Sequence, residues 1–106
     1  MNKCDFTDSA KRDIEDIINY SLKNWGKQQT TKYLDEIYKK TLDLSANPNI
    51  GVLRSNIYQN LFSFPIKKHV IYYIKQPSGI IIIIILHSVM HPTIRNFPIS
   101  KLKIEQ

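Results

Sequence analysis

The sequence predicts an α+β domain: an N-terminal strand, an antiparallel helical hairpin and then a three-stranded antiparallel meander, in the order β-α-α-β-β-β. Three observations predict this class. Apolar residues recur at helical spacing between residues 8 and 46, the pattern changes to the strand type after residue 51, and residues 80–86 are seven consecutive branched aliphatics. Such a run is stable only if both of its faces are covered, so we interpret it as a central strand.

A chain of 106 residues has room for one domain with one core. We place that core at about residues 3–92 and a tail at 93–106. The isoleucine run is far shorter than the ~20 residues that span a bilayer, which argues against a membrane protein. Cys4 is the only cysteine, so we expect no internal disulfide, and the N-terminus shows no apolar signal segment behind a basic start. These features indicate a reducing compartment and predict a cytoplasmic location.

The first half of the chain predicts a short strand and two helices. Lys3–Phe6 alternates as a strand does, and Thr7 is a suitable N-cap for a helix over Asp8–Trp25 that ends at Gly26. A second helix over Lys27–Ala46 follows almost at once, so the two must pack antiparallel. The expected buried stripes are Ala10, Ile14, Ile17, Ile18, Ser21, Leu22 and Trp25 in the first helix, and Thr30, Tyr33, Leu34, Ile37, Tyr38, Thr41 and Leu44 in the second. The expected solvent side of the first helix is Lys11, Arg12, Asp13, Glu15 and Asp16.

Three strands are predicted in the second half, over Ile57–Ile66, His69–Lys75 and Ile80–His87. Lys67-Lys68 and Pro77-Ser78-Gly79 supply the two turns. The helical pair is expected to cover one face of this sheet. A run made almost entirely of isoleucine does not reveal which of its members face the helices.

Charge divides unevenly along the chain. Residues 1–50 carry eight basic and eight acidic side chains, whereas residues 51–106 carry seven basic side chains against Glu105 alone, a net of +6. This half should attract an acidic partner, either a protein or a nucleic acid. The alternative is that the lysines only keep the sheet soluble and protect its edges.

The sequence lacks the residues that several kinds of catalytic or metal site require. Hydrolysis by paired carboxylates is excluded because no acid lies between Asp43 and Glu105. His87 and His91 are four apart but have no third ligand nearby, so we expect no metal, and nothing indicates a cofactor. RNA cleavage through a 2′-hydroxyl needs only an acid, a base and cations. If the protein is a ribonuclease, the catalytic candidates are His69, His87, Tyr72, Lys68 and Arg54.

An ordered series of short motifs carries a family resemblance. The series is Ala10-Lys11-Arg12-Asp13-Ile14, Ile17, Tyr20, Trp25-Gly26, Gln29, Tyr33, Asn47-Pro48, Gly51, Arg54, Leu61-Phe62-Ser63-Phe64-Pro65, His69-Val70-Ile71-Tyr72-Tyr73, Leu86-His87 and Met90-Xaa-Pro92. It resembles the RelE/ParE toxin superfamily of bacterial toxin-antitoxin modules, ParE more than RelE, from about Phe6 to Pro92. The resemblance implies the same order of strand, helical hairpin and meander.

The resemblance also implies a partner and a target. ParE-like toxins are neutralised by an antitoxin and typically act on DNA gyrase, whereas RelE-like relatives cut messenger RNA on the ribosome. Where the ParE pattern usually reads Leu-Arg-Xaa-Phe, this chain has Leu61-Phe62-Ser63-Phe64. Surface recognition tolerates a lost arginine better than catalysis does, so a gyrase-binding poison ranks above a ribonuclease, and a fold that only binds antitoxin or RNA ranks third.

Two sets of binding residues follow from these expectations. We expect the target to bind at the end of the last strand and the tail, and an acidic antitoxin, encoded in an adjacent reading frame, to bind the basic sheet half. The target-binding candidates are His87, Met90, His91 and Arg95. The antitoxin-binding candidates are Lys67, Lys68 and Tyr72.

Overall fold

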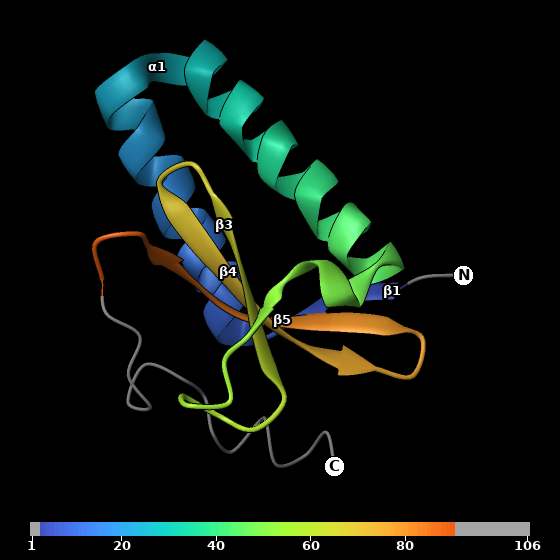
Figure 1. Ribbon diagram of the computed structural model, residues 1–106. Helices are drawn as coiled ribbons and strands as arrows, with labels where there is room; N and C mark the ends of the chain where they lie inside the picture. Colours follow the sequence, from blue (N-terminus) through green and yellow to red (C-terminus); the bar gives the residue numbers. More distant parts are fainter. Residues whose placement is uncertain (1–2, 91–106) are drawn as a thin grey trace.

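The structure is a computed structural model that describes residues 3–90. A five-stranded sheet forms one layer and a long bent helix lies against it as the second (Figure 1). The elements are β1 (Lys3–Phe6), α1 (Asp8–Ala46), a 3-10 turn η1 (Pro48–Ile50), β2 (Val52–Leu53), β3 (Leu61–Ile66), β4 (His69–Gln76) and β5 (Gly79–His87). The strand order is β1-β5-β4-β3-β2. The predicted α+β class is therefore confirmed.

The helical hairpin forms because α1 is broken at Gly26. That residue has φ 85° and ψ 175°, a conformation that only glycine adopts readily, and the chain bends there into two arms, 8–25 and 27–46 (Figure 1). Thr7 is the N-cap, as predicted: its hydroxyl oxygen accepts from the Ala10 N–H at 3.0 Å and donates to the Ile83 carbonyl. Within residues 3–90, no helix is long and apolar enough to cross a membrane.

The predicted buried stripes of the two helices are too wide. Leu22, Trp25 and Tyr38 are 45%, 41% and 60% exposed. The opposite error occurs at Asp13, which we predicted on the solvent side: it is half-buried and accepts a hydrogen bond from the Ile85 N–H at 2.9 Å. Because the sheet covers only one side of each arm, the outer members of a wide apolar stripe remain in solvent.

The meander is confirmed, with β5 lying centrally between a parallel β1 and an antiparallel β4. One boundary is wrong: the strand predicted from Ile57 begins at Leu61. The segment before it folds into turns, in which the N–H groups of Ile57 and Tyr58 both donate to the Arg54 carbonyl and Asn60 has a positive φ of 63°. These hydrogen bonds within the turn replace the hydrogen bonds that a strand would make to its neighbour. The short edge strand β2, which pairs with β3, was not predicted.

A β-bulge in β5 sets the orientation of the isoleucine side chains. Tyr72 pairs with Ile84 and Tyr73 with Ile82, so Ile83 is the additional residue. Ile80, Ile82 and Ile85 therefore pack in the core under α1, whereas Ile83 and Ile84 pack on the opposite face with Leu61 and Tyr72. Two buried clusters result, one on each side of the sheet.

Candidate functional site

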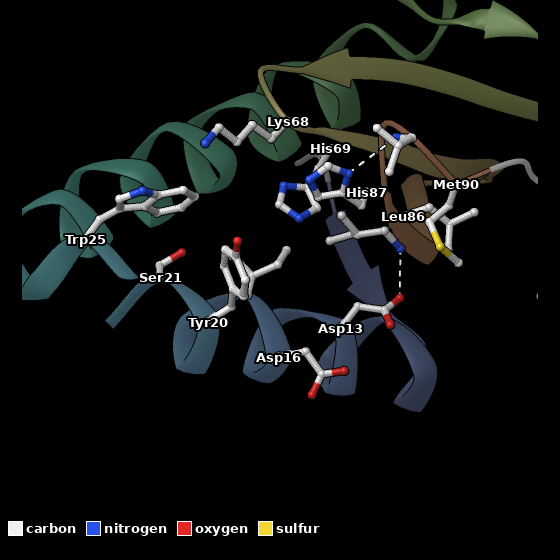
Figure 2. Close-up of a pocket in the computed structure, with 13 residues that line it drawn as sticks. Asp13, Asp16, Tyr20, Ser21, Trp25, Lys68, His69, Leu86, His87 and Met90 are labelled. Atoms are coloured by element: carbon white, nitrogen blue, oxygen red, sulfur yellow. Dashed lines mark hydrogen bonds between the residues drawn. The ribbon is translucent and has the colours of Figure 1, made fainter. Parts of the chain in front are cut away.

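A cavity of about 470 Å³ lies where the end of β5 meets the first arm of α1 (Figure 2). Three segments supply its walls: the first arm up to its apex, the β3–β4 turn with the start of β4, and the end of β5 with the turn that follows. The lining residues are Asp13, Asp16, Ile17, Tyr20, Ser21, Trp25, Lys68, His69, Ile85, Leu86, His87, Val89 and Met90. The bend at Gly26 and the pairing of β4 with β5 thus bring distant parts of the chain to one place.

Two histidines face each other across the sheet ladder at this end. His69 begins β4 and His87 ends β5; they are register partners, and their rings lie 5.3 Å apart in an edge-to-face arrangement. The Tyr33 hydroxyl lies 2.7 Å from Nδ1 of His69 and 3.1 Å from the Ile66 carbonyl oxygen. The hydroxyl has one proton and two possible acceptors, so the tautomer of His69 decides whether Nδ1 donates or accepts in their contact.

The surroundings of His69 favour its neutral form. Burial, reinforced by the nearby His87 and Lys68, lowers the pKa of His69 from 6.5 to about 4. The unfolded chain therefore binds the His69 proton at a higher pH than the folded chain does. This group's contribution to stability is complete above pH 6.5, declines as the pH falls toward 4, and is constant below that.

We expect the free energy of unfolding to fall by about 2 kcal/mol more in the wild type than in His69→Asn between pH 7 and pH 4. Urea titrations at both pH values measure this. Burial raises the pKa of Asp13, which has the opposite effect on the pH dependence, so only the difference between the two proteins isolates His69. Identical pH dependence in the two proteins would contradict the assigned state of His69.

Two lysines connect the β3–β4 turn to the helical hairpin, one at the second arm and one at the apex. The Lys67 ammonium pairs with Glu36 at 2.8 Å, and the Lys68 ammonium lies 3.9 Å above the Trp25 ring. Trp25 also packs edge-to-face on Tyr20, with ring centroids 5.5 Å apart. Both lysine charges thus already have partners within the chain, and the aromatic pair is held at the rim of the cavity.

Ser21 is an exception among the buried polar groups. Its side chain is only 1% exposed, and its hydroxyl has no hydrogen-bond partner among the described residues. Figure 2 shows this hydroxyl turned toward the space that Tyr20 and the histidines surround. A buried hydroxyl without a partner costs stability, so its presence beside a cavity is a sign of function.

The structure separates the residues considered for RNA cleavage. His69, His87 and Lys68 line the cavity on the α1 side of the sheet. Tyr72 packs in the cluster on the opposite face, where Arg54 donates to the Ser63 hydroxyl at 2.9 Å. The five candidates therefore form two groups on two faces instead of one site.

The predicted binding residues are also only partly brought together. Of the target-binding set, His87 and Met90 line the cavity, while His91 and Arg95 lie outside the described residues. Of the antitoxin-binding set, Lys67 and Lys68 share the β3–β4 turn, whereas Tyr72 lies on the other face. Within residues 3–90, no three His, Cys, Asp or Glu side chains converge as a metal ion requires.

Sequence reasoning missed half of the cavity wall. The sequence pattern assigns Asp13, Tyr20, Ser21 and Trp25 to a core stripe, a family motif or a solvent face. A usable signal was present, because Trp25 directly precedes the Gly26 break and so lies at the exposed apex of the hairpin. The role of Asp13 gave no such signal, since its partner is a backbone N–H 72 residues away.

A helical hairpin packed on a meander, with a cavity at the end of β5, defines this chain as a small two-layer α+β domain. The family of the ParE toxin of type II toxin-antitoxin systems, parDE, matches residues 4–92, and the chain belongs to this family. A chain in a solved structure titled "Chromosomal ParDE TA system from P. aeruginosa" has the same fold: TM-score 0.70, 17% identity, 82% of this chain and 96% of that chain covered. No curated protein matches by sequence.

Proposed function

We propose that this chain is a ParE-like toxin that inhibits DNA gyrase by binding it, in the cytoplasm, and that a cognate antitoxin neutralises it. Family membership supports the toxin role and an antitoxin partner. The observation that carries the choice of a binding mechanism is the exposed apolar rim of the cavity. Val89 is 76% exposed and Met90 is 50% exposed, and the exposed rings of Tyr20 and Trp25 line the same cavity. Exposed apolar groups gathered around one cavity mark protein-binding surfaces.

The arrangement of ionisable groups favours binding over RNA cleavage. A ribonuclease needs its acid, its base and its phosphate clamp around one scissile bond. Here the two histidines lie on the α1 side of the sheet, and Arg54 and Tyr72 lie on the other. A gyrase binder needs only a complementary surface, so the second candidate, a ribosome-dependent ribonuclease, ranks lower.

The proposed antitoxin segment is acidic and folds as it binds. The net charge of +6 on residues 51–106 supports this choice. Lys68 is the best-placed described contact in the β3–β4 turn, because its charge is exposed beside Trp25. Lys67 contributes less, since Glu36 already balances its charge.

A supercoiling assay with purified gyrase tests the proposal. We expect the wild-type chain to inhibit supercoiling or to trap cleaved DNA, and Met90→Asp to weaken inhibition at least tenfold, because an apolar rim contact becomes a charge. Removal of residues 93–106 should abolish inhibition. Val52→Asp is the matched control: Val52 is 53% exposed on the far edge strand β2, and its variant should inhibit normally.

The alternative functions predict different results when the same purified protein is assayed. Cleavage of messenger RNA on ribosomes, with gyrase unaffected, would overturn the proposal in favour of a ribonuclease. Inactivity in both assays, with antitoxin binding retained, would leave a fold that only binds its antitoxin. Circular dichroism of each variant shows whether a loss of inhibition has a cause other than unfolding.

A further inference from the structure

We propose that the cavity at the end of β5 is an anchor pocket that takes a tyrosine or tryptophan side chain of a protein partner, with a basic residue beside it. The inference rests on the proposed function only in assigning the occupant to a protein. Tyrosine and tryptophan are the side chains that most often anchor protein interfaces in such pockets. The volume of about 470 Å³ is ample for either one.

The Ser21 hydroxyl indicates that the bound side chain ends in a polar group. Its hydroxyl lies at the bottom of a cavity walled mainly by apolar groups such as Ile17 and Ile85, and it has no hydrogen-bond partner among the described residues. Lys68 and Trp25 line the same cavity, and both of these side chains are exposed. An apolar occupant would leave the hydroxyl unpaired, whereas a phenol or an indole N–H would satisfy it.

A second polar group in the wall favours the same occupant. Nδ1 of His69 is in contact with the Tyr33 hydroxyl at 2.7 Å, which leaves Nε2 for the occupant. A phenol hydroxyl is both a donor and an acceptor, so it complements Nε2 in either tautomer of His69. Phenylalanine and leucine lack such a donor, so the pocket should distinguish tyrosine from phenylalanine.

The charges at the opening of the cavity predict the type of residue that lies next to the anchor side chain. Asp13 and Asp16 line one side of the cavity, while the only ammonium group among its described lining residues, that of Lys68, lies over the Trp25 ring. A basic residue next to the anchor would lie opposite the two carboxylates, which favours association. The same carboxylates repel phosphate, so a nucleotide that stacks on Trp25 fits this site less well.

Nuclear magnetic resonance on the isolated full chain tests the pocket. Trp25 is the only tryptophan, so its indole N–H signal reports on the rim without ambiguity. The probes are N-acetyl-tyrosinamide, N-acetyl-phenylalaninamide, the capped dipeptides Arg-Tyr and Glu-Tyr, and adenosine monophosphate. We expect saturable shifts at Trp25, Ser21 and His69, with tyrosine binding about fivefold more tightly than phenylalanine and Arg-Tyr more tightly than Glu-Tyr.

Ser21→Ala separates this role from a structural one. The variant should bind the tyrosine probe about fivefold more weakly and the phenylalanine probe equally well, while its melting temperature rises by about 4–8 °C because an unpaired buried hydroxyl is removed. Leu22→Ala is the matched control. It changes a neighbouring residue that is 45% exposed and does not line the cavity, so its affinities should equal those of the wild type.

Four results would overturn the proposal: equal affinity for tyrosine and phenylalanine, tighter binding of adenosine monophosphate than of tyrosine, no saturable shift at Trp25, or a lower melting temperature for Ser21→Ala. All four are measured without gyrase. Failure of the pocket proposal is thus distinguishable from failure of the supercoiling assay, which tests the target.

Discussion

Ile82→Asp should yield no folded protein. Ile82 is fully buried in the central strand and packs in the core beneath α1, and β1 and β4 cover its two edges. Loss of the isoleucine contacts costs about 2–5 kcal/mol, and burial of an unpaired carboxylate adds several more. The sum is comparable with the total stability of a typical small domain, about 5–15 kcal/mol. Far-ultraviolet circular dichroism and the dispersion of amide signals measure the loss.

Milder substitutions at Ile82 test the same prediction in proteins that still fold. Ile82→Val should cost about 1 kcal/mol and Ile82→Ala about 2–5 kcal/mol, so both should be measurable by urea titration even though the aspartate variant is not. Val52→Asp introduces the same carboxylate on an exposed strand position and should retain its fold. Wild-type melting of Ile82→Asp would show that β5 is not the buried centre of the sheet.

The existence and order of the main elements could be predicted because each one has a local signal. The helical period, the N-cap Thr7 and the break at Gly26 each act within a few residues, and the structure confirms all three. The isoleucine run likewise indicated a strand covered on both faces. Strand β2 has only two residues and exists because β3 pairs with it, so no local pattern marks it.

The orientation of the isoleucine side chains depends on a β-bulge that the sequence pattern does not reveal. A strand normally alternates its faces strictly, but the bulge at Ile83 places Ile83 and Ile84 on the same face. In an alternating apolar and polar strand, the shift would appear as two adjacent apolar residues. In a run of isoleucines nothing changes at the bulge, and the position has to be read from its pairing with Tyr72 and Tyr73.

The candidate site was predicted only where its residues have distinctive chemistry. His87 and Met90 were assigned to the end of the last strand, and the structure places both in the cavity wall. Ser21 and Asp13 were not singled out, because a serine and an aspartate in an amphipathic helix are ordinary. Their importance comes from long-range contacts: the Ile85 N–H for Asp13, and the lack of any partner among the described residues for Ser21.

The start of the central strand should be almost as sensitive as its middle. A Cβ at Gly79 would overlap the carbonyl oxygen of Lys3 and lie 2.6 Å from the Lys3 nitrogen, because β1 approaches β5 closely at this point. The three nearest atoms all belong to the Lys3 backbone, so no flexible side chain is there to move aside. We expect Gly79→Ala to lower the free energy of unfolding by about 2–3 kcal/mol, which corresponds to about 10–20 °C in melting temperature.

Hydrogen exchange should show where the structure gives way in Gly79→Ala. Relief of the overlap requires β1 to move away, so the Thr7 amide, which donates to the Ile82 carbonyl at 3.0 Å, should lose protection while the amides of β4 keep theirs. Ser78→Ala alters an exposed residue in the same turn and should stay within about 0.5 kcal/mol of the wild type. If Gly79→Ala matched Ser78→Ala in both stability and exchange, β1 would not pair with β5 in the register seen here, and the covering of the central strand on that side would have to come from another segment.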